Sequence, residues 1–181
     1  MAASYRVRDL LGVLALIVAV PGSSAPLIAS QFPARILAAH NAERARAGVP
    51  LLVWDNDLGT AAAAYAQQMA FTGRFEHSDR ALRRGIGENL WYGTRGAFPV
   101  EAMVAGWASE RRMFTPGIFP NVSRTGNWVD VAHYTQVIWP TTQRIGCALA
   151  STAQVDYLVC RYAPAGNIDG RPVGYPIPQR G

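Results

Sequence analysis

The feature that most restricts the fold of this chain is a pair of apolar segments near its C-terminal end. Ile145–Ala150 and Val155–Cys160 flank the short polar segment Ser151–Gln154. Apolar and β-branched residues bounded by small polar residues are typical of strands. The pattern therefore predicts two strands joined by a tight turn, each with one of the chain's two cysteines, Cys147 and Cys160.

The N-terminal segment predicts export from the cytoplasm. Arg6 and Arg8 precede the apolar run Leu10–Val20, and small residues follow it as far as Ala25. This order is typical of a secretory signal peptide. We assign residues 1–25 to that peptide, with cleavage one residue earlier as an alternative, and expect a secreted protein, extracellular or periplasmic. An uncleaved anchor is disfavoured, because the run is shorter than the roughly 18–20 residues of a stable membrane span.

Export determines how the two cysteines are interpreted. An even number of cysteines in an oxidising compartment favours a disulfide, and facing positions on a hairpin suit its geometry. We expect Cys147 and Cys160 to be bonded, which would stabilise the native state by roughly 2–4 kcal/mol. Two free buried thiols are the alternative, and they would suit a cytosolic protein better.

Composition excludes several classes of protein. The chain has 181 residues, of which 50% are hydrophobic and 16% charged, and a formal net charge of +5. The apolar fraction excludes a disordered chain, and the length favours one domain. The seventeen basic residues are all arginines. They are scattered along the chain and form no focused patch with interleaved aromatic residues, so nucleic-acid binding is not expected.

Three helices are expected before the hairpin. Apolar periodicity, capping residues and helix-terminating glycines predict them. The segment His133–Trp139 fits a helical turn and a strand equally well. The last residues, 168–181, are rich in proline and glycine, and we expect an extended tail on the surface. The expected helices are Phe32–Ala47, a second between Asn56 and Gly73, and a third from Pro99 towards Phe114.

Two glutamates in apolar surroundings need partners. Glu110 falls on the same predicted helix face as Trp107, and Glu88 lies among glycines and apolar residues. An unpaired buried carboxylate is unfavourable. His77 and His133, which lie in predicted loops, could supply these partners.

Nearby arginines such as Arg84 and Arg111 are equally good candidates, and the spacing does not decide between the two arrangements. His40 lies on the apolar side of the first predicted helix. A hydrogen-bonded core histidine is the better interpretation there.

Several short segments resemble, in order, signatures of the CAP superfamily, which comprises cysteine-rich secretory proteins, antigen 5 and pathogenesis-related 1. The resemblance covers about Ile36 to Asn167. The matching segments are His40-Asn41 with Arg44, Trp54-Asp55, His77-Ser78 with Gly87–Leu90, Trp107–Glu110, His133–Trp139 and Tyr157–Tyr162 with Pro164 and Asn167.

The resemblance implies an α+β fold, a three-layer α-β-α sandwich with a central antiparallel sheet. Residues 26–167 would form the CAP domain and 168–181 the tail, and Cys147 and Cys160 match one family disulfide. It also implies that four residues meet in one open cleft. The all-arginine composition with only two cysteines would suit a bacterial member from a GC-rich genome. The four cleft residues are His77, Glu88, Glu110 and His133.

The function favoured by the resemblance is a ligand- or metal-binding module without established catalysis. His77 and His133 would hold a divalent metal, and zinc suits imidazole ligands. The ligand would be a small molecule, a lipid or a protein. For a lipid, the irregular loop Thr115–Asp130 is the candidate contact, although a loop packed on itself is favoured there.

A metal-dependent hydrolase is the alternative function. A histidine-bound metal with a glutamate-activated water could cleave a substrate. The chain has no HExxH segment, however, and Ser78 beside His77 is not a recognised catalytic pairing. Binding is therefore the stronger hypothesis.

Overall fold

The computed structural model describes residues 25–174 of the chain. The predicted signal peptide, apart from Ala25, lies outside this range, as do the last seven residues of the tail. The helices are α1 (Ala25–Ala47), α2 (Asn56–Thr72), α3 (Val100–Ala108) and α4 (Ala132–Val137), with short 3-10 helices η1 (Arg80–Arg83), η2 (Ser109–Arg112) and η3 (Trp128–Val131). The strands are β1 (Val53–Trp54), β2 (Gly87–Thr94), β3 (Gly117–Ile118), β4 (Arg144–Ser151), β5 (Val155–Ala163) and β6 (Pro172–Val173).

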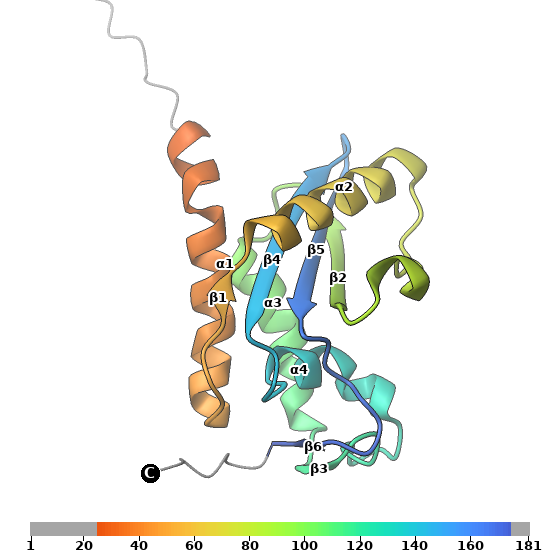
Figure 1. Cartoon of the computed structure of the whole chain (residues 1–181). Helices are drawn as coiled ribbons and strands as arrows, with labels where there is room; N and C mark the ends of the chain where they lie inside the picture. The colour runs from red at the N-terminus through yellow and green to blue at the C-terminus, as the bar shows by residue number, and fades with distance from the viewer. Residues whose placement is uncertain (1–24, 175–181) are drawn as a thin grey trace, which may run out of the picture.

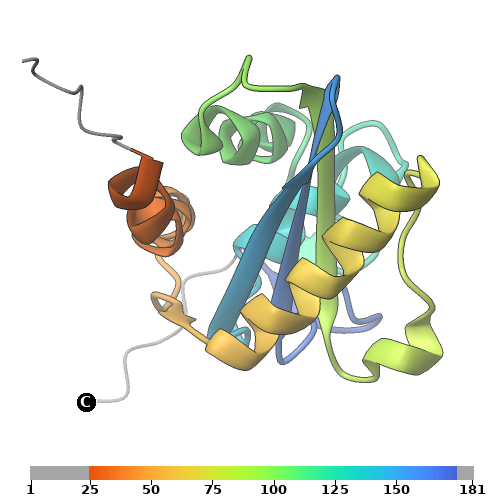
Figure 2. The same cartoon turned by 90° about the horizontal axis from the view of Figure 1, so that it is seen from above.

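The centre of the fold is a four-stranded sheet with the order β1-β4-β5-β2. Strands β4, β5 and β2 pair antiparallel, whereas the short edge strand β1 pairs parallel with β4. Helix α2 covers one face of the sheet, and α1, α3 and α4 lie on the other side (Figures 1 and 2). The expected α+β sandwich is confirmed, with β1 making its sheet mixed.

Each face of the sheet has its own apolar core. On the α2 side, residues of the helix pack against Leu90, Tyr157 and Val159. On the other side, the larger core includes Leu158 and Tyr162. Successive side chains of a strand point to opposite faces of the sheet. Consecutive residues of β2 and of β5 therefore belong to different cores.

The hairpin and its disulfide are as predicted. Strands β4 and β5 pair with Cys147 directly opposite Cys160. The two sulfur atoms are bonded, and the two Cα atoms lie 4.1 Å apart. Both cysteines are buried in the larger core.

The predicted ends of the helices agree with the structure only in part. Asp55 caps α2 by accepting hydrogen bonds from Asp57 and Leu58, and Gly73 ends it with φ 70°. Helix α1 is longer than expected, since it begins at Ala25 and runs through Pro33. Helix α3 is shorter and gives way to η2 at Ser109.

Two further segments are settled by tertiary packing. The ambiguous segment His133–Trp139 is mainly helical, as α4, and its side chains from Tyr134 to Trp139 are buried. The tail is less superficial than expected, since Val173 in β6 pairs with Gly117 and is fully buried. Among the residues that the structure describes, no helix has the length and apolarity to cross a membrane.

Candidate functional site

The first histidine–glutamate pair joins the loop after α2 to the start of β2. Nδ1 of His77 lies 2.8 Å from Oε1 of Glu88. The backbone N–H and the hydroxyl of Ser78 also donate to this carboxylate, at 3.0 and 2.8 Å. The Glu88 side chain is fully buried, whereas the His77 side chain is 52% exposed.

Two arginines complete the surroundings of Glu88. Arg161, directly opposite it on β5, approaches to 3.1 Å, and Nε of Arg83 lies at 3.6 Å. Burial alone would raise the pKa of Glu88, but the hydrogen bond from His77, the charge of Arg161 and the bonds from Ser78 outweigh it and lower that pKa. Glu88 is therefore held as a carboxylate at neutral pH.

The two glutamates thus differ in whether a histidine or an arginine is their partner. Glu88 uses both kinds, although its arginines are Arg83 and Arg161 and not Arg84. Glu110 uses a histidine, and Arg111 pairs with Glu43 instead.

The second pair is built on η2 and the first turn of α4. Nδ1 of His133 lies 2.6 Å from Oε1 of Glu110. The other carboxylate oxygen accepts from the backbone N–H groups of His133 and Tyr134, both at 3.0 Å. The ring of Trp107 stacks on the imidazole at 6.2 Å between centroids. Glu110 lies three positions after Trp107, so one turn supplies both contacts that fix His133.

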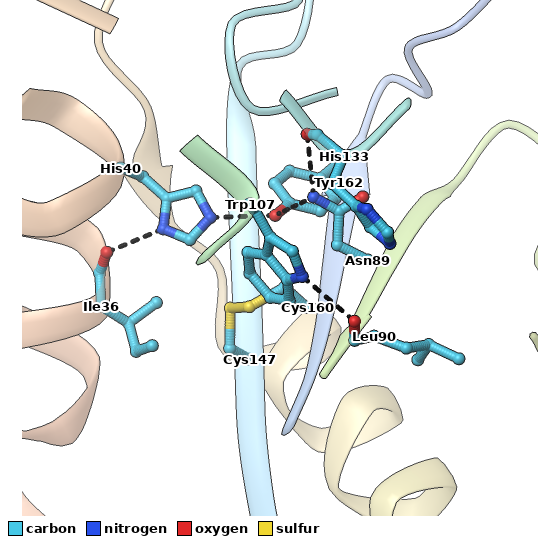
Figure 3. The surroundings of a disulfide bond; sticks show 9 residues. All are labelled: Ile36, His40, Asn89, Leu90, Trp107, His133, Cys147, Cys160 and Tyr162. Carbon is cyan, nitrogen blue, oxygen red and sulfur yellow. Dashed lines mark hydrogen bonds between the residues drawn. A yellow bond between two sulfur atoms is a disulfide. The ribbon is translucent and has the colours of Figure 1, made fainter. Parts of the chain in front are cut away.

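The main chain of His133 and the side chain of Glu88 lie on opposite sides of the start of β2. Glu88 lies in the layer of α2, and its neighbour Asn89 points the other way and donates to the carbonyl of His133 at 3.1 Å (Figure 3). Across residues 25–174, no three His, Cys, Asp or Glu side chains are grouped so as to hold one metal ion. The structure therefore arranges the four predicted residues as two histidine–glutamate pairs, and the single open cleft stays a prediction.

The third histidine has the structural role that was expected. His40 is fully buried, with Nδ1 2.8 Å from the carbonyl of Ile36 and Nε2 2.9 Å from the hydroxyl of Tyr162. Because a carbonyl only accepts, Nδ1 is the donor and Nε2 accepts from the hydroxyl. Desolvation lowers the pKa of His40 to about 4. Asn89 donates to the same hydroxyl at 3.2 Å, so a buried polar chain links His40 to the segment of His133 (Figure 3).

The sequence analysis did not identify Arg161 as a partner of Glu88. The signal was present, since Arg161 is the one basic residue between Val155 and Ala163. A buried arginine requires compensating acceptors, and the register places Glu88 opposite it. Its guanidinium also lies 5.5 Å from the ring centre of Tyr65 on α2.

The loop Thr115–Asp130 is half packed on the protein. Phe119 and Val122 are buried, whereas Ile118 and Trp128 are 49% and 40% exposed. The ring of Phe119 contacts that of Trp128 edge-on at 5.3 Å. Only the exposed side chains, Ile118 and Trp128, remain candidates for a lipid contact.

The hydrogen bonds around His77 do not form a nucleophile and base. The Ser78 hydroxyl donates to Glu88 and not to the imidazole. Glu88, with its lowered pKa, is a weak base. The geometry therefore does not favour acyl transfer by serine, which needs a nucleophile in contact with its base.

Comparison with known proteins identifies the class to which this fold and site belong. The profile named "CAP: Cysteine-rich secretory protein family" matches residues 37–162. Pathogenesis-related protein 1C of Nicotiana tabacum is 34% identical over 136 residues, which cover 75% of this chain and 76% of the relative. The chain belongs to the CAP family.

Other relatives are longer than the shared domain. "Repressed by EFG1 protein 1" of Candida albicans is 39% identical over 146 residues, which are 77% of this chain and 48% of the relative. Scoloptoxin SSD976 of Scolopendra dehaani is 33% identical over 67% of this chain and 58% of the relative. The chain thus spans about half the length of these two. Sequence relatives from a plant, a yeast and a centipede give no support to the expected bacterial origin.

A solved structure with the same fold is the one titled "Crystal structure of NaASP2 with Zn2+". It superimposes with a TM-score of 0.67 at 24% identity, over 77% of this chain and 83% of the other. At that identity the likeness defines the fold alone.

Proposed function

We propose that this chain is a secreted binding module of the CAP family whose His77 and His133 bind a divalent metal, zinc by preference. The observation that carries the proposal is shared by both histidines. In each imidazole the Nδ1–H group donates a hydrogen bond to a carboxylate, and neither Nε2 atom has a hydrogen-bond partner among the described residues. A carboxylate on Nδ1 fixes the tautomer and leaves the Nε2 lone pair for a metal.

The donor set fits zinc chemically. Neutral imidazole suits zinc, and carboxylates behind the imidazoles raise their basicity. Glu88 and Glu110 would act in this way and would not ligate. With two protein ligands, water would complete the coordination, and the binding would be weaker than at a closed structural zinc site. A bound zinc ion would supply a Lewis acid, and Glu88 and Glu110 would fix the orientation of the two imidazoles that hold it.

Zinc titration of untagged protein tests the proposal. A ligand at 100 times its dissociation constant stabilises the folded state by roughly 2.7 kcal/mol, so zinc is expected to raise the melting temperature at pH 7.5. The increment is expected to shrink at pH 5.5, since free histidine protonates near pH 6.5 and a protonated imidazole cannot ligate.

The three histidines provide matched variants for this titration. His77→Ala and His133→Ala should each remove most of the increment, whereas His40→Ala should keep it on a lower baseline. Glu88→Gln or Glu110→Gln should weaken zinc binding by roughly 10–100-fold. An identical zinc shift in wild type and all three alanine variants would refute the paired-histidine site.

The secreted state has its own support and its own test. The N-terminal segment 1–25 has the pattern of a signal peptide, and one relative carries the name "Secreted protein RBT4". N-terminal sequencing of the exported protein should find a start near Pro26. A start at Met1 on the exported chain would contradict the assignment.

A further inference from the structure

The two most exposed large apolar side chains among the described residues lie close together in the sequence. Phe71, in the last turn of α2, is 92% exposed, and Leu82, in η1, is 85% exposed. Single exposed apolar residues are common on protein surfaces, but several large ones in one region indicate a binding surface.

Two aromatic rings extend this apolar region. Phe75 and Tyr92 are 43% and 57% exposed, and their ring centroids lie 4.5 Å apart. The end of α2, the loop after it and η1 together form the right-hand edge of the molecule in both views (Figures 1 and 2). We call residues 71–84 with Tyr92 the outer edge.

The outer edge is also positively charged. Residues 71–84 contain four arginines and two acidic residues, which gives a net charge of 4 − 2 = +2. Arg83 turns inward to Glu88, with 13% of its side chain exposed. Arg74, with 77% of its side chain exposed and 4.0 Å from Glu76, and the exposed Arg80 and Arg84 remain beside the apolar residues. With the exposed Glu76 and Asp79 they leave a net charge of 3 − 2 = +1 on the surface.

We propose that the outer edge binds the surface of a lipid bilayer that contains anionic phospholipids. Phe71 and Leu82 would insert between the headgroups, and Arg74, Arg80 and Arg84 would contact lipid phosphates. Apolar side chains that alternate with cations are the combination that the interface of an anionic bilayer attracts.

The charge on the outer edge argues against a second copy of this chain as the occupant. A symmetric dimer through this surface would bring the same arginines face to face, and like charges across an interface are unfavourable. An anionic bilayer offers opposite charge and an apolar layer within a few ångströms of each other. The binding depends on neither Nε2 atom and is therefore independent of the proposed metal site.

Vesicle co-sedimentation tests this proposal with wild-type protein. Vesicles of phosphatidylcholine alone are compared with vesicles of roughly two parts phosphatidylcholine to one part phosphatidylserine, which carry the negative surface potential that attracts arginine. The protein should sediment with the anionic vesicles and much less with the neutral ones. Added salt should weaken the binding.

Variants of exposed residues locate the contact. Phe71→Ser and Leu82→Ser should each lower the vesicle partition coefficient by roughly tenfold or more, from the apolar area that no longer inserts. Leu51→Ser is the matched control, because Leu51 is 59% exposed and precedes β1, at the opposite edge of the sheet from β2. The triple variant Arg74→Gln, Arg80→Gln, Arg84→Gln should lose the preference for anionic vesicles. Arg95 is exposed, follows the end of β2 and lies outside the outer edge, so Arg95→Gln should keep that preference.

Several results would overturn the proposal. These are equal binding to both vesicle types, no binding to either, or the same loss in Leu51→Ser as in Phe71→Ser. A concentration-dependent dimer in sedimentation equilibrium that Phe71→Ser dissociates would assign the surface to self-association instead. Wild-type protein should bind anionic vesicles equally with and without a metal chelator, so failure of the metal site and failure of the bilayer contact are separately visible.

Discussion

The two histidine–glutamate pairs have similar short contacts but hold their carboxylates by different means. Glu88 is fully buried and is neutralised by side chains from β5, η1 and the loop after α2. Glu110, with 16% of its side chain exposed, is held mainly by two backbone N–H groups of α4. The first arrangement depends on tertiary charge pairing, whereas the second depends on the local path of the backbone.

This difference predicts which carboxylate matters more for stability. Around Glu88, removal of the carboxylate leaves the buried Arg161 and the half-buried Arg83 without their counter-ion. Around Glu110, removal of the carboxylate leaves two backbone N–H groups and one imidazole without their acceptor. Water can reach these groups more easily than it can reach the surroundings of Glu88. The pair with the more exposed histidine is therefore the one with the more critical glutamate.

Glu88→Ala is expected to have the largest effect. Removing one partner of a buried ion pair destabilises a protein by roughly 3–5 kcal/mol, and urea denaturation at pH 7 measures the loss. Glu110→Ala should lower the free energy of unfolding by only about 1–3 kcal/mol, the range for buried donors left without acceptors. Equal losses in the two variants would show that the distinction between the pairs has no energetic consequence.

The same comparison explains how much of the site could be predicted from sequence. The need of Glu88 and Glu110 for partners follows from their apolar neighbours, and both predicted histidines are indeed their partners. The partnership of Glu88 with Arg161 was missed because it depends on the register of β2 against β5, which local patterns do not encode. The family resemblance supplied the set of four residues, but not its division into two histidine–glutamate pairs.

The fold was predictable where local signals determine it. Asp55 and Gly73 bound α2 as expected, because a capping side chain and a left-handed glycine act within one turn. The segment around His133 was ambiguous because nearly all of it is buried, so no periodic apolar face distinguishes a helix from a strand. The early end of α3 at Ala108 was not predicted, because the apolar period continues from α3 into η2.

His40 sharpens the comparison, because it is a histidine without a carboxylate partner. Its pKa of about 4 in the folded state lies below the value of about 6.5 for an unfolded chain. Between these values the unfolded state binds more protons, so this contribution to stability is present above pH 6.5 and is lost as the pH falls towards 4. The expected loss from this group is about 3 kcal/mol.

Urea denaturation at pH 7, 6 and 5 measures this effect. In His40→Gln the dependence of stability on pH should be distinctly shallower than in wild type, whatever the baseline stability of the variant. Because Glu88 has a lowered pKa, its contribution is lost at lower pH, below the ordinary range of a glutamate near 4.3. An unchanged slope in His40→Gln would exclude His40 as the titrating group in this window.

Tyr65→Phe is expected to have the smallest effect, and it separates the two pairs most cleanly. The Tyr65 hydroxyl donates to the carbonyl of Glu76 at 2.7 Å, next to His77, while its ring lies over Arg161. Phenylalanine keeps the ring and removes only the hydrogen bond, which contributes about 0.5–1.5 kcal/mol in a typical protein. Amide hydrogen exchange should therefore accelerate around His77, with little change in global stability.

The amides of His133 and Tyr134 should exchange as in wild type, because Glu110 holds them on the other side of β2. Equal acceleration at both pairs would mean that the two halves of the site open together, and that the local anchoring of each pair is not independent.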